Sequence, residues 1–244
     1  MISIIAHRGY SARFRENSIS AWREAAMAGS DVVEADIRFT ADGIGVCVHD
    51  ADLSRLAGRS EAIAAVDYAA LSGLAAGGEP VAPLFADALA AVPVGTALLL
   101  DVKDESPESL DRLHDLVTEA AARDIILGLH RIESVRAMAG RGHSRILALT
   151  LDRDEGQAFH DAGATIVRVW EADVTGERLA PLLARSVPVW STVGDKGLKT
   201  ESGTERLVGD FEADNLRRIA ALGVTGFLVN DPVGARAALA GVTA

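Results

Sequence analysis

Residues 32–50 read VVEADIRFTADGIGVCVHD, and this stretch decides how the rest of the chain is interpreted. In its first half, Glu34 and Asp36 alternate with apolar residues, so both carboxylates lie on one face of a predicted strand. Only a short turn containing Asp42-Gly43 separates this strand from a second strand-like run at 44–48. Parallel strands need a crossover of about a dozen residues or more, whereas Asp-Gly is a typical hairpin turn. The stretch therefore predicts a strand followed by an antiparallel return to its starting point.

Short apolar runs alternate with longer amphipathic segments along the whole chain, a pattern typical of repeated βα units. Eight such units in 244 residues favour an α/β fold, a (β/α)8 TIM barrel with an extra β-hairpin after its second strand. No linker or composition shift marks a second domain, so we predict a single domain over residues 1–244 with a small insertion around 37–66. The predicted strands are residues 2–7, 31–37, 97–103, 125–129, 146–151, 165–170, 188–193 and 226–230. The predicted helices are residues 18–28, 68–91 in one or two pieces, 108–123, 132–139, 153–162, 175–185, 211–222 and 234–240.

The composition is that of an ordinary globular protein, with 49% hydrophobic and 24% charged residues. A net charge of −11 argues against binding to nucleic acid or to an anionic membrane, although a local cluster of cations can still hold an anionic substrate. The single cysteine, Cys47, excludes an internal disulfide framework and suits a reducing compartment. We expect no signal peptide and no stable membrane insertion, and therefore a cytoplasmic protein, because prolines and an aspartate interrupt the longest apolar region. The oligomeric state stays open.

Polar side chains gather at the carboxyl ends of three predicted strands and at the end of the hairpin. Active sites of (β/α)8 barrels lie at this end of the strands. Apolar residues flank these polar groups, and a buried charge without a partner costs several kcal/mol, so convergent carboxylates imply a cation between them. The polar groups are His7, Arg8, Glu34, Asp36, His49, Asp50, Asp101 and Lys103.

The carboxylates of Glu34, Asp36 and Asp101 predict a site for one divalent metal ion. Oxygen ligands favour Mg²⁺ or Ca²⁺, and the absence of a cysteine or histidine cluster argues against zinc. Beside such an ion, His7 and His49 suit acid–base chemistry on a phosphate ester near neutral pH. We therefore expect a small-molecule phosphodiester as the substrate.

Several short motifs occur in a characteristic order along nearly the whole chain, and those of the N-terminal half are the more specific. They are HRG at 7–9, ENS at 16–18, EAD at 34–36, DG at 42–43, HD at 49–50, LSR at 53–55, GEPVAPL at 78–84, DVK at 101–103, PVWSTV at 188–193, GVTG at 223–226 and NDP at 230–232. In this order they resemble the glycerophosphodiester phosphodiesterase family, which has the phosphatidylinositol phospholipase C-like phosphodiesterase barrel.

The resemblance implies a two-step reaction. The neighbouring glycerol hydroxyl attacks phosphorus, an alcohol leaves, and water then opens the cyclic phosphate to give glycerol 3-phosphate. Two histidines act as general base and acid and exchange roles between the steps, and which of them is the base in the first step stays open. The implied residues are Glu34, Asp36 and Asp101 as metal ligands, His7 and His49 as catalytic groups, and Arg8 and Lys103 as phosphate ligands.

The sequence departs from the family pattern at several positions. Asp101 stands where the family usually has glutamate, so the third ligand is one methylene shorter. Aspartate is expected there in the related sphingomyelinase D-like enzymes, but these lack the Arg-Gly after the first histidine. Arg15 replaces a proline, Gly128-Leu129-His130 replaces a Ser-Phe pair, and Gly194 replaces an asparagine. The changes lie on the substrate side and leave the alcohol group of the substrate open.

Four further residues, Glu16, His130, Trp170 and Trp190, are candidates for a substrate pocket. The two tryptophans are predicted to end strands at the active face, where they suit an aromatic wall, although packing in the core fits them equally well. Asn17, next to Glu16, is predicted to cap the first helix.

Three functions are compatible with these residues. The first is hydrolysis of glycerophosphodiesters such as glycerophosphocholine or glycerophosphoethanolamine. The second is a lysophospholipase D-like or sphingomyelinase D-like phosphodiesterase, and the third is a barrel that binds phosphodiesters without cleaving them. Because all the expected acid–base and metal-binding residues are present, the sequence favours the first.

Overall fold

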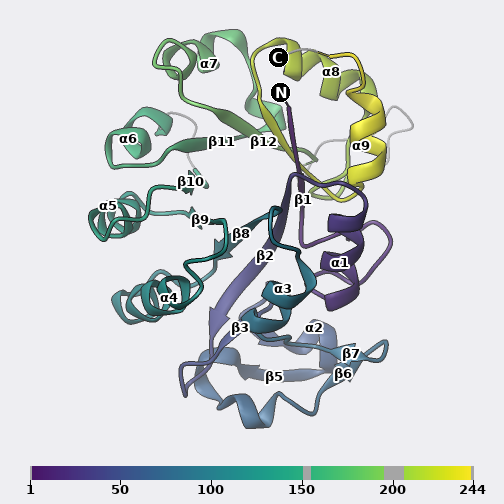
Figure 1. Cartoon of the computed structure of the whole chain (residues 1–244), viewed down its shortest axis with the longest axis vertical. Helices are drawn as coiled ribbons and strands as arrows, with labels where there is room; N and C mark the ends of the chain where they lie inside the picture. The colour runs from purple at the N-terminus through teal and green to yellow at the C-terminus, as the bar shows by residue number, and fades with distance from the viewer. Residues whose placement is uncertain (1, 151–154, 195–205, 243–244) are drawn as a thin grey trace.

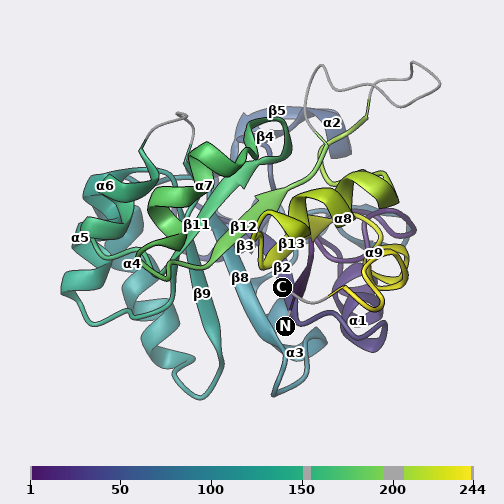
Figure 2. The same cartoon turned by 90° about the horizontal axis from the view of Figure 1, so that it is seen from above.

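The short apolar runs form eight parallel strands that close into a barrel surrounded by helices (Figure 1). A computed structural model describes residues 2–150, 155–194 and 206–242. β1 is hydrogen-bonded to both β2 and β13, which closes the ring and confirms the predicted TIM barrel. Figure 2 shows α4, α5 and α6 on one side of the strands and α1, α8 and α9 on the other. The strands of the ring are β1 (Ser3–Ala6), β2 (Val32–Phe39), β8 (Ala97–Val102), β9 (Ile125–Leu129), β10 (Ile146–Ala148), β11 (Ile166–Trp170), β12 (Val189–Thr192) and β13 (Gly226–Val229).

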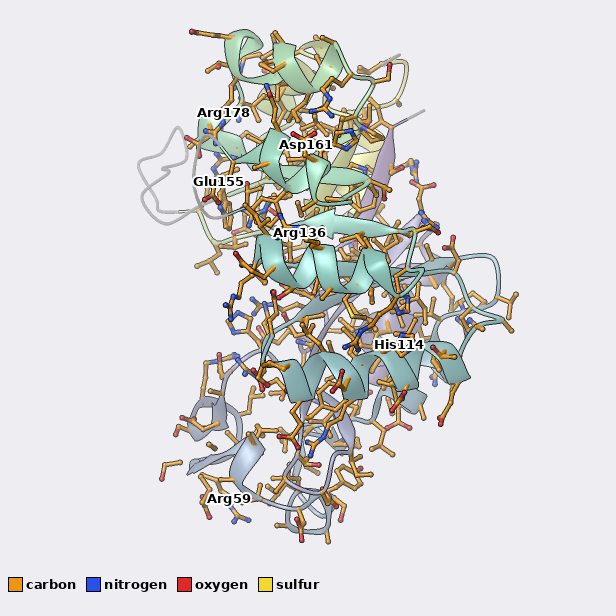
Figure 3. The ribbon with its side chains drawn as sticks, turned by 90° about the vertical axis from the view of Figure 1, so that its left-hand side faces the viewer. Arg59, His114, Arg136, Glu155, Asp161 and Arg178 are labelled. Atoms are coloured by element: carbon orange, nitrogen blue, oxygen red, sulfur yellow. The ribbon has the colours of Figure 1, made fainter. Side chains whose placement is uncertain are left out.

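Helices follow the strands and cover the outside of the ring, and Figure 3 shows α4 to α7 in succession along one side. Side-chain oxygens of Ser18, Ser106, Thr175 and Asp231 accept backbone N–H groups at the first turns of α1, α4, α7 and α9. In the described part of the chain, no helix is long and apolar enough to cross a membrane. The surrounding helices are α1 (Ile19–Met27), α3 (Phe85–Ala91), α4 (Pro107–Glu119), α5 (Ile132–Gly140), α6 (Gly156–Asp161), α7 (Gly176–Leu183), α8 (Ala213–Ala221) and α9 (Pro232–Ala238).

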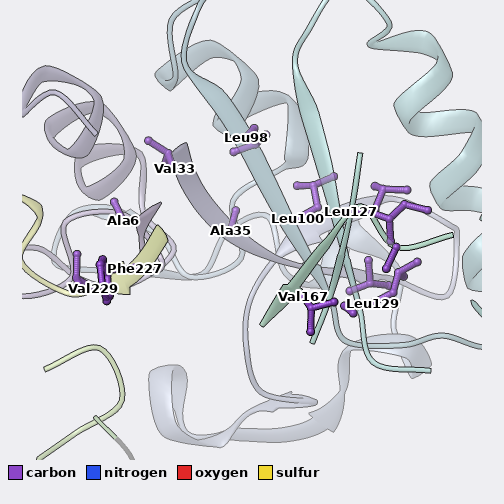
Figure 4. Close-up of a cluster of buried hydrophobic side chains, with 14 of the residues drawn as sticks. Ala6, Val33, Ala35, Leu98, Leu100, Leu127, Leu129, Val167, Phe227 and Val229 are labelled. Atoms are coloured by element: carbon purple, nitrogen blue, oxygen red, sulfur yellow. The ribbon is translucent and has the colours of Figure 1, made fainter. Parts of the chain in front are cut away.

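Strand residues alternate between two apolar layers. Outward side chains such as Val33, Ala35 and Leu100 belong to the large cluster between the strands and the helices (Figure 4). A second cluster fills the barrel interior at the amino-terminal ends of the strands and includes Leu99. Because Val33 and Ala35 face outward, Glu34 and its neighbour at Asp36 face inward, above this apolar filling. Glu34 and Asp36 therefore lie toward the carboxyl-terminal end of the barrel.

The hairpin after β2 is confirmed. β3 (Gly45–Cys47) runs antiparallel to β2, with Ile37 opposite Cys47 and Phe39 opposite Gly45. Cys47 is fully buried in the outer core layer, as a structural cysteine would be. The antiparallel return brings residue 49 back along β2, where Arg38 donates to its carbonyl.

The segment after the hairpin differs from the prediction. The expected helix at 68–91 is helical mainly in α3, because glycines and prolines interrupt its first half. Gly77 and Gly78 have positive φ angles of 62° and 83°, which suits a turn rather than a helix. The excursion has its own apolar cluster, which includes Leu71 and Val81, so the insertion reaches well beyond residue 66. Its elements are β4 (Asp52–Leu53), α2 (Ser54–Ala57), β5 (Arg59–Ala62), η1 (Ile63–Ala65), η2 (Tyr68–Ala70), β6 (Ala75–Ala76) and β7 (Glu79–Pro80).

Two predicted elements extend past the described residues. The strand predicted at 146–151 and the helix predicted at 153–162 both reach into 151–154, and they correspond to the shorter β10 and α6. After the strand predicted at 188–193 the sequence has a polar stretch at 195–210, of which residues 195–205 also lie outside the described residues.

Candidate active site

Three carboxylates meet inside the carboxyl-terminal end of the barrel. Glu34 and Asp36 come from β2, and Asp101 comes from β8, where it is the direct register partner of Asp36. One oxygen of each lies within 4.8 Å of the others. Glu34 and Asp36 are each only 1% exposed. Three like charges at this distance, two of them buried and one partly buried, are costly unless cations balance them.

Two basic side chains supply part of that balance. The ammonium of Lys103 lies 2.8 Å from Oδ1 of Asp36 and 2.6 Å from Oδ2 of Asp101. The guanidinium Nε of Arg8 lies 3.2 Å from Oδ2 of Asp36. Burial opposes the ionisation of Asp36, but Lys103 and then Arg8 outweigh it and lower the pKa of this carboxyl. Two cations thus face three carboxylates.

Glu34 is the carboxylate that this balance leaves out. Its Oε2 accepts the backbone N–H of Arg8 at 2.5 Å, whereas its buried Oε1 has no hydrogen-bond partner among the described residues. Burial, with Asp36 and Asp101 adding to it, raises the pKa of Glu34 well above its ordinary value. An orphaned buried oxygen beside two more carboxylates fits a hard divalent cation, for which oxygen ligands are preferred. The residues present therefore fit the metal that the sequence predicted.

The loop after β1 folds Arg8 against this group through unusual backbone angles. Arg8 and Gly9 have φ angles of 55° and 81°, both in the left-handed region. A Cβ at Gly9 would lie 2.6 Å from the backbone of Ala21 in α1, so only glycine fits there. The strained turn aims the Arg8 N–H at Glu34, and such strain is common at functional sites.

Asn17 holds Asp36 from two sides. Its Nδ2 donates to Oδ2 of Asp36 at 2.6 Å, and its Oδ1 accepts the backbone N–H of Asp36 at 3.0 Å. The predicted helix cap at Asn17 is wrong, because Ser18 occupies that position and accepts the N–H of Ala21. A left-handed φ of 48° turns Asn17 away from α1 and toward β2. No local pattern around Asn17 in the sequence indicates that it binds Asp36.

His7 is held by a residue from the last strand. Its Nδ1 lies 3.0 Å from Oδ1 of Asn230. The Nδ2 of Asn230 donates to the carbonyl of Val208 at 2.8 Å and to Oδ1 of Asp210 at 3.0 Å. Both of these partners are acceptors, so the amide must present its oxygen to His7, which assigns the proton to Nδ1 and the free lone pair to Nε2. Burial, reinforced by Arg8, lowers the pKa of His7 to about 4, so the ring is neutral at pH 7.

His49 is fixed in the same tautomer by a neighbouring carboxylate. Its Nδ1 lies 2.8 Å from Oδ1 of Asp50, which assigns the proton to Nδ1 and again leaves Nε2 as the acceptor. Arg38 donates from Nε and from a terminal nitrogen to the backbone carbonyl of His49, at 3.0 and 2.8 Å. Asp50 is itself paired with Arg55 at 2.6 Å. Arg38, Asp50 and Arg55 therefore support His49, a role that no local sequence pattern indicates for any of them.

Glu16 bridges two arginines at the rim of the site. One of its oxygens lies 3.0 Å from Arg8 and the other 2.5 Å from Arg55. Because both oxygens are engaged in ion pairs, the structure shows Glu16 connecting the Arg8 loop to the segment that carries His49.

Of the other predicted pocket residues, His130 contacts the carboxylate group and Trp170 stacks on an arginine. His130 reaches the carboxylate group, with Nε2 2.8 Å from Oδ1 of Asp101. Trp170 ends β11, and the guanidinium of Arg168 stacks 4.1 Å above its ring.

The expected position of Trp190 at the active face is wrong. It lies one residue into β12, opposite Gly226 at the start of β13. Its ring packs where a Cβ at Gly226 would be only 2.5 Å away. The residue belongs to the interior apolar cluster and borders a cavity of about 470 Å³ that is also lined by Ser3 and Thr225. β12 continues past Trp190 to Thr192, so the tryptophan lies at the amino-terminal end of the barrel.

Together these groups suit acid–base chemistry at an anionic centre. Two imidazoles each have a defined Nε2 acceptor, two basic side chains neutralise negative charge, and three carboxylates form a site for a cation. The larger cavity of about 620 Å³ between β11 and α7, lined by Gln157 and Arg178 among others, shares no residue with this group.

Comparisons with known proteins point to one family. A family model described as the glycerophosphoryl diester phosphodiesterase family matches residues 7–233. The chain is 52% identical over 54 residues to glycerophosphodiester phosphodiesterase 1 of Homo sapiens, an alignment that covers 22% of this chain and 16% of the human protein. It is 36% identical over 90 residues to a Mycobacterium tuberculosis protein named probable glycerophosphodiester phosphodiesterase 2, which covers 36% of this chain and 34% of the relative. The chain thus matches about a third or less of the length of these curated relatives.

Solved structures share the fold over almost the whole chain. A phosphodiesterase of Oleispira antarctica in complex with the product sn-glycerol-3-phosphate superposes with a TM-score of 0.78 at 17% identity, covering 98% of this chain and 96% of that one. A glycerophosphodiester phosphodiesterase of Thermotoga maritima gives a TM-score of 0.74 at 19% identity, covering 96% of both chains. At this level of identity the likeness establishes the barrel fold alone.

Proposed function

Since the chain belongs to the glycerophosphoryl diester phosphodiesterase family, we propose that it hydrolyses glycerophosphodiesters to glycerol 3-phosphate and an alcohol. The observation that carries the proposal is the meeting of Glu34, Asp36 and Asp101 beside two histidines whose tautomers leave Nε2 as a proton acceptor. The product bound to the Oleispira antarctica phosphodiesterase is the product proposed here.

One divalent metal ion, Mg²⁺ or Ca²⁺, completes the proposed site. Glu34, Asp36 and Asp101 would hold it, and the orphaned Oε1 of Glu34 supports this assignment. When bound, such an ion supplies a positive charge that polarises the phosphoryl oxygens and stabilises charge developing on them.

His7 and His49 move the protons. Each ring has its Nδ1 proton committed to a fixed acceptor, so each takes a proton at Nε2. One imidazole removes the proton from the attacking glycerol hydroxyl, and the other, once protonated, gives a proton to the leaving alcohol oxygen. In the second step the roles exchange, and water takes the place of the hydroxyl. Arg8 and Lys103, already positioned by the carboxylates, bind the non-bridging phosphate oxygens.

The test is release of glycerol 3-phosphate from glycerophosphocholine and glycerophosphoethanolamine, with and without EDTA. We expect turnover that EDTA abolishes and Mg²⁺ or Ca²⁺ restores. His7→Ala should lower kcat by about 10²–10⁴-fold, the usual contribution of a general acid or base. His143→Ala is the matched control, because His143 pairs with His114 between α4 and the loop after α5, outside the site.

Two results would contradict the proposal. Full activity in EDTA would refute the metal dependence, and full activity of His7→Ala would refute the acid–base mechanism. A parallel assay with lysophosphatidylcholine separates the alternative: cleavage of the lysophospholipid with inert glycerophosphodiesters would favour a lysophospholipase D-like enzyme.

A further inference from the structure

One polar contact of the carboxylate group comes from a strand that supplies no proposed ligand. His130 follows β9 and lies with Nε2 2.8 Å from Oδ1 of Asp101. Its backbone N–H donates to Oε1 of Glu105 at 2.5 Å, and the adjacent N–H of Arg131 donates to Oε2 of the same residue at 3.2 Å. Glu105, on the loop after β8, therefore anchors the turn that carries His130 toward β8.

The strand register places a residue without a side chain beside Asp101. Gly128 is the register partner of Asp101 and faces inward, two residues before His130. A Cβ at Gly128 would lie 3.2 Å from the carbonyl of Leu100 and 2.9 Å from the side chain of Leu149. The side chain of Leu149 packs against Gly128 at this level, and the imidazole that meets Asp101 comes from His130, two residues further along the chain.

The contact completes the support of Asp101, whose side chain is shorter than that of Glu34. Aspartate has one methylene fewer than glutamate, so the position of its carboxylate depends more on its hydrogen-bond partners. Lys103 holds Oδ2 of Asp101 at 2.6 Å, and His130 holds Oδ1 at 2.8 Å. Since a carboxylate only accepts, the contact assigns a proton to Nε2 of His130. Each oxygen keeps a further lone pair for a cation.

We propose that His130 is a positioning residue that orients Asp101 toward the divalent cation, and this proposal rests on the metal-dependent function proposed above. His130 is not itself a ligand: in the described ranges, the ligand atoms that gather within 4.8 Å of one another belong to Glu34, Asp36 and Asp101, and His130 is not among them. Groups that hydrogen-bond a ligating carboxylate fix its geometry, and their loss typically weakens metal binding by about 10–100-fold.

The experiment measures the affinity of the intact protein for Mn²⁺ and for Mg²⁺ by calorimetry. The electron paramagnetic resonance spectrum of bound Mn²⁺ is the second readout. His130→Ala should weaken Mn²⁺ binding by roughly 10–100-fold. His130→Gln should retain most of the affinity, because its amide nitrogen also donates to Asp101. His143→Ala, the same substitution at the histidine pair on the outer surface, should bind Mn²⁺ like the wild type. Thermal unfolding without metal identifies any variant that fails to fold.

A second background tests whether His130 acts through Asp101. In Asp101→Glu the added methylene carries the carboxylate toward the cation, so His130→Ala should weaken binding much less there than in the wild type. If the spectrum of bound Mn²⁺ shows coupling to a nitrogen in the wild type and this coupling is absent from His130→Ala, then His130 is a metal ligand and the positioning role is overturned. Equal losses from His130→Ala in both backgrounds would also overturn it.

The failure of this inference differs from a failure of the proposed function. Equal Mn²⁺ affinities of wild type and His130→Ala, with the wild type binding metal and active, would overturn the role of His130 alone. A wild-type protein that binds no divalent metal would overturn the metal-dependent function and this inference with it.

Discussion

Replacing Glu34 by glutamine should stabilise the metal-free protein while impairing metal binding. Glu34 is 1% exposed, and its Oε1 has no hydrogen-bond partner in the described part of the chain. Glu34→Gln preserves the shape of the side chain, removes one of three clustered negative charges, and puts an N–H donor among the remaining carboxylates. The amide oxygen can still accept the N–H of Arg8.

The size of the effect follows from the spacing of the carboxylates. Unit charges no more than 4.8 Å apart repel by roughly 3–4 kcal/mol at an effective dielectric constant near 20, and Lys103 and Arg8 offset much of this. We therefore expect the free energy of unfolding to rise by about 1–3 kcal/mol without metal. For a chain of this size that corresponds to a Tm increase of about 2–4 °C per kcal/mol.

The stability gained by Glu34→Gln depends on pH. Burial, Asp36 and Asp101 raise the pKa of Glu34, so the wild type loses stability as pH rises from the ordinary carboxyl range toward the raised pKa of the folded state. The advantage of Glu34→Gln should therefore be full above that raised pKa and vanish at low pH, where the wild-type carboxyl is protonated.

The assay is urea unfolding at pH 8 in EDTA and in Mg²⁺. Mg²⁺ at about 100 times its Kd should stabilise the wild type by about 2.7 kcal/mol, and Glu34→Gln by much less. Glu108→Gln is the matched control, because Glu108 is 76% exposed and pairs with Arg112 on α4, where the pair contributes about 0.3–0.5 kcal/mol. The reasoning is refuted if Glu34→Gln is less stable than the wild type in EDTA, or if both gain equally from Mg²⁺.

Three other outcomes can be checked. Asn230→Ala removes the acceptor of the His7 Nδ1 proton and should lower kcat by about 10–100-fold with little change in KM, measured by steady-state kinetics; an unchanged kcat would contradict the tautomer assignment. The contribution of His7 to the stability of the metal-free protein should fall as pH falls from 6.5 toward 4, because its lowered pKa favours the neutral ring in the folded state; in urea titrations, the free energy of unfolding of the wild type relative to His7→Ala should therefore decrease over this range. Gly9→Ala should cost roughly 2–5 kcal/mol in the same titrations, because a Cβ there meets the backbone of Ala21 and the φ of 81° disfavours alanine; a loss under about 1 kcal/mol would show that the turn can relax.

The features that the sequence determined by itself depend on local periodicity and turn chemistry. Alternation along residues 32–39 places Glu34 and Asp36 on the same face of β2. The Asp42-Gly43 turn allows only a short antiparallel return, so β3 follows. Repetition of βα units then implies the barrel, and a barrel brings the carboxyl ends of its strands together. The carboxylate group is therefore predictable from the chain alone.

Only the tertiary structure decided which partners hold these side chains. Asn230 reaches His7 because β13 pairs with β1 when the ring closes, a contact between residues 223 positions apart. His130 reaches Asp101 because the register sets Gly128 beside it, and Trp190 lies at the opposite end of the barrel because β12 starts at Val189. Local patterns specify which way a side chain faces, but strand register, barrel closure and left-handed turns such as that at Asn17 specify what it meets. Those depend on the packing of the whole chain, and no short stretch of sequence records them.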